Sequence, residues 1–517
     1  MPLQEPPPPG QNRLRECRLR YGLTQQEVAD EVTRLAWERD RRVVGVDAES
    51  VSRWERGERR PRKYYRQLLC LLFGTTEPEL GFRRPLPLEE GLAPGLTEAP
   101  PGNGAIPRPT AGRRPQVPSG TPGSPIAVNV VGGVDAQLEE ACAVFRAERD
   151  WQGAADCFTQ GFRLARTRGE IPSWIVRTSA DLAEAGQWSA LDVLSRQPEL
   201  DGSPVAALAI GLQGITLRAR GPIDEALARF DTALRSPGLG GEAATLLQLH
   251  RAHALHSMGR LPDAEREYDR LAAEAPGYAE LVRVPRAHVQ YAHGCFAESL
   301  GAAEPLPADE FARASALQLV GHVNRVNGNL IEAEAVYRSV LAHAAEVRSL
   351  ALESSARTSL AETLSWLNQS AARDLALEAV RFNRIIGSCL DLPKAYAALA
   401  VAEHGEGALT RAEAAVEAGL AAVAVAGYRP GALFPLVARV FQRLIARETT
   451  GALRAHEELG ALTEELGAYR YWWEISAWWL RESGVEPRGL VTSNAEWLAS
   501  RRATAARWRA VLRHRRA

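Results

Sequence analysis

The stretch GPIDEALARFDTAL (221–234) decides the fold of most of this 517-residue chain. In it, Ala226 is followed by Phe230 after four positions and by a second alanine after seven, which is the spacing of one buried helix face. The same frame returns in LPDAEREYDRL (261–271) and in LIEAEAVYRSV (330–340). A small residue, an aromatic ring and a further apolar residue on one face predict a short amphipathic helix that packs closely on a neighbour.

This frame repeats along the chain at steps of 34 to 40 residues. Its nine positions, some of them fainter copies, are Ala154, Ala190, Ala226, Ala264, Ser299, Ala333, Ala372, Ala412 and Ala452. In five units another small residue lies twelve positions earlier: Gly214, Ala252, Ala287, Gly321 and Ala400. A near-constant step of this size predicts one helical hairpin per repeat, and the small residues let the two helices approach closely.

The repeats resemble the tetratricopeptide repeat (TPR) family over roughly 135–480. No part of this region shows sustained two-residue alternation, so we expect an all-α fold with a C-terminal TPR-like α-solenoid. We expect residues 481–517 to form capping helices and a basic tail. Residues 85–126 contain 11 Pro and 7 Gly, so we interpret 85–134 as a disordered linker.

Ahead of the linker, LRECRLRYGLTQQEVADEV (14–32) predicts a helix, a tight turn and a second helix. Thr24 and Glu27 form a capping-box pattern at the start of the second helix. AESVSRWE (48–55) predicts a third helix, which the preceding Asp47 can cap, and residues 62–73 predict a fourth.

This segment resembles the lambda-repressor-like (XRE-type) helix-turn-helix family. The matching residues are Gly22, Leu23, Thr24, Gln25, Glu27, Val28 and Ala29, then Val51, Ser52, Arg53, Trp54, Glu55, Arg56, Gly57, Arg60 and Pro61. The resemblance implies a five-helix DNA-binding domain over 11–84. The chain departs from the family at 33–45, which is longer than the usual turn. We therefore expect the second helix to continue to about Arg39, followed by a loop.

In such folds the third helix enters the major groove of double-stranded DNA. The resemblance implies base contacts from Ala48, Glu49, Ser52 and Arg53. It implies phosphate contacts from Gln25, and local charge suggests further ones from Arg41, Arg42, Arg59, Arg60 and Arg62. It also implies that Arg18 and Glu55 form a structural ion pair between the first and third helices.

Charge agrees with a DNA-binding interpretation. Nine basic and four acidic residues lie between 41 and 66, a local net charge of +5 in a chain of net charge −1. The alternative is a solvated surface in an arginine-rich chain, which has 60 arginines and only two lysines. Because the positive charge coincides with the third helix, we favour DNA.

In several units, polar residues lie eleven and eight positions before the first residue of the repeated pattern (Ala264 or Ala333, for example). These positions fall on the helix expected to line a concave groove. The predicted ligand groove contains Arg218, His253, His256, His288, Tyr291, His322 and Arg325. Such a groove suits a peptide or a protein partner, but a solvated concave face carries polar residues in any case. His250, His253 and His256 cannot share one metal ion, since their offsets spread them around a helix. We expect no metal and no other cofactor.

The C-terminal stretch YRYWWEISAWWL (469–480) has a wide aromatic face that must be covered. Either the preceding repeats or a tail helix at 494–512, with Trp497 and Trp508, covers it, or it is a dimer interface. We expect a homodimer.

The sequence therefore favours a sequence-specific transcriptional regulator with a TPR-like sensor and assembly domain. The alternative is a non-catalytic adaptor that uses the helix-turn-helix fold for docking. No catalytic motif is present, so we expect no enzyme. The N-terminus lacks a signal-peptide pattern and no run of about 18 residues is apolar, so we expect a cytoplasmic protein without a membrane span.

Overall fold

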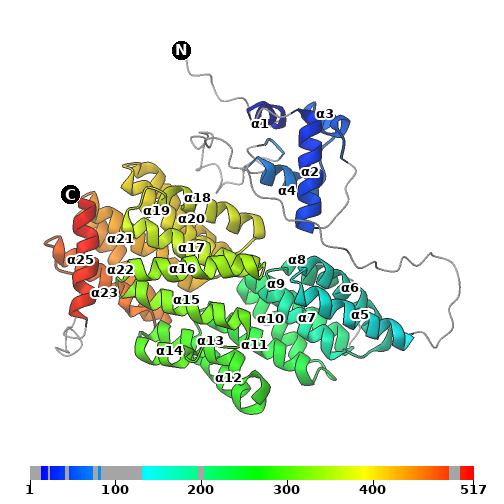
Figure 1. Cartoon of the computed structure of the whole chain (residues 1–517). Coiled ribbons are helices and arrows are strands. Elements are labelled where there is room, and N and C mark those ends of the chain that lie inside the picture. Colours follow the sequence, from blue (N-terminus) through cyan, green and yellow to red (C-terminus); the bar gives the residue numbers. More distant parts are fainter. Residues whose placement is uncertain are drawn as a thin grey trace.

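A computed structural model describes residues 13–20, 24–40, 46–73, 80–82, 131–195, 203–487 and 501–516. Within these ranges all regular structure is helical, so the all-α prediction is confirmed (Figure 1). None of the described helices is long and apolar enough to cross a membrane.

The N-terminal segment contains the helices expected from its capping residues. They are α1 (Leu14–Arg20), α2 (Gln25–Asp40), α3 (Ala48–Glu55) and α4 (Lys63–Leu72). The Asp47 carboxylate accepts a hydrogen bond from the Ser50 backbone amide at 2.7 Å and caps α3. The second helix extends to Asp40, as predicted to within one residue. A fifth helix is not among the elements that the structure describes between 13 and 82.

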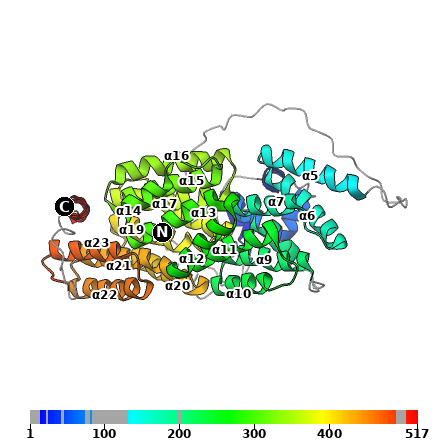
Figure 2. The ribbon, with the colours of Figure 1, turned by 90° about the horizontal axis from the view of Figure 1, so that it is seen from below.

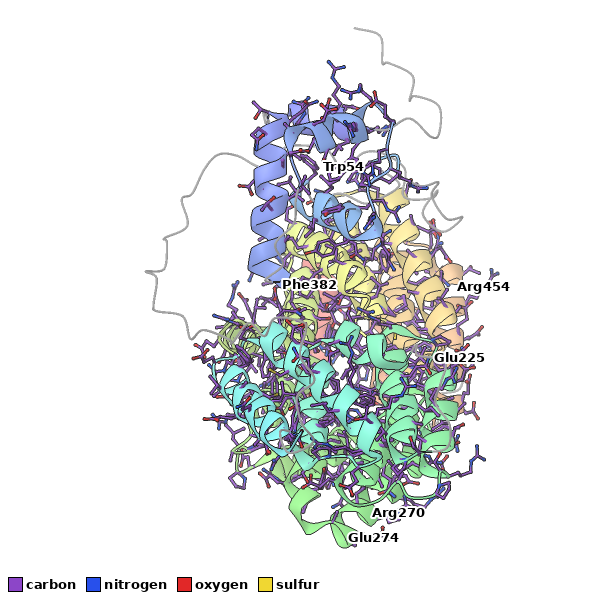
Figure 3. The ribbon with its side chains drawn as sticks, turned by 90° about the vertical axis from the view of Figure 1, so that its right-hand side faces the viewer. Trp54, Glu225, Arg270, Glu274, Phe382 and Arg454 are labelled. Atoms are coloured by element: carbon purple, nitrogen blue, oxygen red, sulfur yellow. The ribbon has the colours of Figure 1, made fainter. Side chains whose placement is uncertain are left out.

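These four helices enclose a small apolar core of their own. Val28 and Val32 of α2 pack with Val51 and Trp54 of α3 and with the leucines of α4. Trp54 is buried between the helices (Figure 3). Its ring centroid lies 5.4 Å from that of Tyr65. The core thus fixes α3 through one face and leaves the opposite face to solvent.

From Val131 on, the described residues form a series of helical hairpins (Figure 2). The pairs are α5 (Val131–Ala147) with α6 (Trp151–Arg168), α7 (Ser173–Glu184) with α8 (Trp188–Ser195), α9 (Pro204–Arg220) with α10 (Ile223–Leu234), α11 (Gly241–Ser257) with α12 (Leu261–Glu274), α13 (Ala279–His293) with α14 (Phe296–Ala303), α15 (Glu310–Val326) with α16 (Leu330–Glu346), α17 (Leu350–Leu367) with α18 (Ala372–Ile386), α19 (Leu392–Gly405) with α20 (Leu409–Ala426), and α21 (Leu433–Ile445) with α22 (Thr449–Leu466). Two short 3-10 turns, η2 (Pro276–Tyr278) and η3 (Arg429–Ala432), precede α13 and α21. The final helices are α23 (Arg470–Glu482) and α25 (Arg502–Arg516). The described helices resume with α5 at Val131, and residues 85–130 of the predicted linker over 85–134 lie outside the described residues.

The repeat frame read from the sequence falls on the second helix of all nine hairpins, which confirms the stacked-hairpin prediction. A Cβ atom on Gly214 would lie 2.8 Å from the Phe230 ring, and one on Gly321 would lie 2.5 Å from the Tyr337 ring. In these two units the twelve-residue spacing has a steric cause: the aromatic ring of the second helix lies against a glycine, where a side chain would collide with it.

The hairpins wind into a superhelix that closes on itself. The backbone amide of Leu350 donates to Ala185 O at 3.0 Å, that of Cys389 to Ala219 O at 2.9 Å, and that of Tyr469 to Ala292 O at 2.6 Å. These three bonds join the turns inside hairpins two, three and five to the connections that follow hairpins six, seven and nine. We call this line of contacts the seam. An open concave groove was expected, but the seam narrows the inner face to a partly open cavity.

The tail helix α25 covers the C-terminal aromatic face. Trp479 Nε1 donates to Trp508 O at 2.8 Å, and Trp508 Nε1 donates to Val326 O at 2.7 Å. Trp472, Trp479 and Trp508 are all buried, and Trp366 packs against the last two rings. A dimer interface on this face is therefore excluded, since the chain itself occupies it. Trp497 lies outside the described residues.

Candidate functional site

The first candidate surface is α3, which buried polar contacts hold in place. Arg18 Nε donates to Glu55 Oε1 at 2.5 Å, and a second nitrogen donates to Glu55 Oε2 at 3.2 Å. The Glu55 side chain is 3% exposed and that of Arg18 is 11% exposed, so this ion pair is shielded from water. It raises the pKa of Arg18, chiefly through the hydrogen bond to Glu55. The predicted structural pair between the first and third helices is present.

Gln25 joins this network. Its side-chain nitrogen donates to Glu55 Oε2 at 2.7 Å, and the residue is partly buried. Gln25 thus helps to position α3 from the start of α2. Its contact to a DNA phosphate stays a prediction.

The solvent-facing side of α3 is polar and internally paired. Arg53 Nε donates to Glu49 Oε1 at 3.0 Å, Arg56 Nε donates to Glu58 Oε1 at 2.6 Å, and Arg56 also bonds the Ser52 hydroxyl. The side chains of Glu49 and Arg53 are 57% and 51% exposed. Ion pairs this exposed are weak, so both groups can change partners at low cost. Ala48 is partly buried at the first turn.

The remaining phosphate candidates divide into two groups. Arg59, Arg60 and Arg62 are exposed just after α3. Arg41 and Arg42 lie outside the described residues.

The second candidate site is a cavity of about 220 Å³ inside the superhelix. Its walls come from the first helices of hairpins four to nine, from η3 and from α23. The lining residues are His256, Ser257, His288, Tyr291, His322, Arg325, Ser355, Leu390, Asp391, Lys394, Tyr428, Pro430, Leu433, Phe434, Tyr469, Tyr471 and Trp472. Five predicted groove residues are among them: His256, His288, Tyr291, His322 and Arg325.

The other two predicted groove residues do not line this cavity. Arg218 lies farther along the interior near Glu184, and desolvation lowers the pKa of Arg218 and raises that of Glu184. His253 packs against His250 and Tyr268, with ring centroids 5.5 and 5.8 Å away. The prediction treated each unit alike, but the superhelix brings only some units to the cavity.

The histidines of the interior are neutral. Desolvation lowers the pKa of His256 to about 3 and that of His288 to about 4, and it lowers the pKa of His322 well below its usual value. His322 Nδ1 lies 2.6 Å from the Tyr337 hydroxyl. These rings therefore offer hydrogen bonds rather than positive charge. In the described part of the chain, no group of three or more His, Cys, Asp and Glu side chains is arranged to hold a metal ion.

The basic side chains of the cavity wall are Arg325 and Lys394, and the acidic one is Asp391. Arg325 is 1% exposed and forms an ion pair with Glu362, yet its Nε atom has no hydrogen-bond partner among the described residues. Lys394 Nζ donates to the Ser359 hydroxyl at 2.8 Å. The ring centroid of Phe434 lies 5.7 Å from the Arg325 guanidinium carbon and 5.5 Å from Lys394 Nζ. Desolvation, followed by repulsion from Arg325, lowers the pKa of Lys394 to about 7.

Lys394, Asp391, Phe434 and Trp472 were missed by the sequence reasoning. They come from α21, α23 and the beginning of α19, which meet α13 and α15 only after the superhelix closes. One signal was present: Lys394 is one of two lysines in a chain with 60 arginines. An exchange of arginine for lysine changes hydration and pKa behaviour, so a rare lysine is informative.

Comparison with known proteins gives no family for the chain. No protein-family model matches it, and no curated protein matches it. Two solved structures are similar at low identity. One is a Rap protein complexed with competence and sporulation factor, with 11% identity and a TM-score of 0.32, covering 75% of this chain and 97% of that one. The other is Bacillus thuringiensis PlcR in complex with the peptide PapR7 and DNA, with 10% identity and a TM-score of 0.23, covering 73% of this chain and 96% of that one. The fold description therefore rests on the helix packing above.

Proposed function

We propose that the protein is a sequence-specific, DNA-binding transcriptional regulator whose superhelix binds an effector. The effector is a peptide, a small ligand or a protein partner. The observation that carries the DNA part is α3 itself: a buried Arg18–Glu55 pair fixes one face, while Glu49 and Arg53 are exposed on the other.

The chemistry of α3 suits base recognition. An arginine matches the two acceptors of guanine, and a glutamate accepts from the cytosine amino group. Arg59, Arg60 and Arg62 follow α3 directly and add positive charge for phosphates. Because one such helix reads few base pairs, we expect two copies of the chain to bind a two-fold site. We propose that the protein acts in the cytoplasm, free of membranes.

Selection of bound fragments from random double-stranded DNA with the full-length protein tests this proposal. We expect one enriched sequence, lost or relaxed at one position in Arg53→Ala. Arg266→Ala is the matched control, because Arg266 is an exposed arginine of the solenoid, 73% exposed and ion-paired with Asp263. The affinity of the wild type should fall steeply with salt.

The competing function is an adaptor that uses its N-terminal helices for docking. It predicts no enriched sequence and no steep salt dependence. Equal enrichment by the wild type and Arg53→Ala would also contradict the assignment of α3 as the reading helix.

A further inference from the structure

We propose that the cavity inside the superhelix binds a small carboxylic acid with an aromatic or branched apolar body, its carboxylate between Arg325 and Lys394. This inference names the chemistry of the effector site and rests on the proposed function in that respect. It does not depend on DNA binding.

The first argument is an unused donor. Arg325 is 1% exposed, and its Nε atom lacks a hydrogen-bond partner in the part of the chain that the structure describes. A buried donor without an acceptor carries the cost of its lost hydration. Glu362 pairs with another nitrogen of the same guanidinium, so Nε remains for a ligand oxygen.

The second argument is a second basic side chain, Lys394, which lines the cavity together with Arg325. Desolvation, followed by repulsion from Arg325, lowers the pKa of Lys394. The Asp391 carboxylate is itself held by the hydroxyls of Ser354 at 2.7 Å and Ser388 at 3.3 Å. An anion beside Lys394 would offset this repulsion and favour its charged form.

The third argument is the apolar wall. Phe434 faces both cations, and Trp472 lies 5.5 Å from the Arg325 guanidinium carbon. Tyr291 and Tyr471 continue this wall, with ring centroids 5.5 Å apart. A ligand with one charged end and an apolar body would meet both parts of the lining, as is typical of small-molecule sites.

Size distinguishes a small acid from a peptide. A cavity of about 220 Å³ lies below the range of about 300–1,000 Å³ that is typical for drug-sized ligands. The cavity is partly open, and backbone hydrogen bonds such as Cys389 N to Ala219 O hold its walls together. Its small volume therefore favours a small compound over a peptide.

Isothermal titration calorimetry with the full chain, without DNA, tests the proposal. The probes are phenylacetate, 3-phenylpropionate and 3-methylbutanoate, each paired with its primary amide, which has nearly the same shape and no charge. We expect at least one acid to bind at a ratio of one per chain and to bind about tenfold or more tightly than its amide, equivalent to about 1.4 kcal/mol.

Two variants complete the experiment. Lys394→Met keeps the length of the side chain, and we expect it to weaken acid binding about tenfold without changing amide binding. Arg218→Gln is the control, because Arg218 is an interior arginine that does not line the cavity; it should bind the acid like the wild type. The comparison of acid and amide on the wild type stands even if a variant misfolds.

Three results would overturn the proposal: no acid binds, an amide binds as tightly as its acid, or folded Lys394→Met binds the acid unchanged. Binding of acids without any effect on DNA affinity would leave this site intact and contradict only its regulatory role. Conversely, sequence-selective DNA binding with no acid bound would sustain the proposed regulator and remove this ligand class.

Discussion

Gly321→Ala probes the contact that sets the hairpin geometry. Gly321 lies on α15, opposite Tyr337 of α16. A Cβ atom there would lie 2.5 Å from Tyr337 Cε1 and 2.9 Å from Cζ. Real side-chain contacts are not this short, so the ring or the helix must move. Tyr337 is fully buried and its hydroxyl lies 2.6 Å from His322 Nδ1, so moving the ring also disturbs a wall of the cavity.

Two opposing effects decide the magnitude. Alanine is favoured over glycine within a helix by about 1 kcal/mol. Overpacking of a well-packed core costs about 1–3 kcal/mol. Because Tyr337 has a hydrogen bond to lose as well as packing, we expect a cost near the upper end. The free energy of unfolding should therefore fall by about 1–2 kcal/mol.

Gly301→Ala is the matched control. Gly301 lies within α14 and is exposed, and a Cβ atom there would meet nothing within 4 Å. Here the helix preference acts alone, so the same substitution should stabilise the protein, by up to about 1 kcal/mol.

Native-state hydrogen exchange measures both variants locally, because a repeat array does not unfold as one two-state unit. The backbone amides of α15 and α16 should lose protection in Gly321→Ala and keep it in Gly301→Ala. If the α15 amides of Gly321→Ala are as well protected against exchange as those of the wild type, the steric explanation of the twelve-residue spacing is wrong.

Three further predictions concern other parts of the chain. Trp508→Ala should lower the free energy of unfolding of the C-terminal helices by about 3–5 kcal/mol. The expected readout is a lower midpoint of urea unfolding. A midpoint equal to that of the wild type would mean that α25 is not needed to cover the aromatic face. Burial lowers the pKa of His250 to about 3. Below about pH 6.5 the unfolded state therefore binds a proton that the folded state does not, and the free energy of unfolding falls as the pH falls. At pH 5 this residue alone lowers the free energy of unfolding by about 2 kcal/mol. His250→Gln should therefore flatten the acid side of the stability curve measured by thermal melting between pH 7 and 5, and a slope identical to that of the wild type would contradict a neutral buried imidazole. Glu55→Ala removes the acceptor of both the Arg18 ion pair and the Gln25 hydrogen bond. Removing one partner of a buried pair costs about 3–5 kcal/mol, so hydrogen exchange in α1 and α3 should accelerate, while exchange in the solenoid should not change.

Much of the fold followed from the sequence because its causes are local. The spacing of Ala226 and Phe230 places both on one helix face, and a small residue twelve positions earlier receives the ring. Asp47 and the second-helix extension to Asp40 are equally local, since capping and helix propensity act within one or two turns. The Arg18–Glu55 pair was implied by resemblance alone, and the geometry then placed its atoms together.

The tertiary structure decided what the interior became. Superhelical closure depends on a small rotation between successive repeats, which accumulates over several hairpins. The total rotation cannot be inferred from any one short segment of the sequence. Closure turned an expected solvated groove into a cavity of about 220 Å³ and lowered the pKa of its histidines through desolvation. It also brought Lys394 and Phe434 against Arg325, across separations of 69 and 109 residues. The chain order determined which side chains face inward, whereas the seam determined which of them meet.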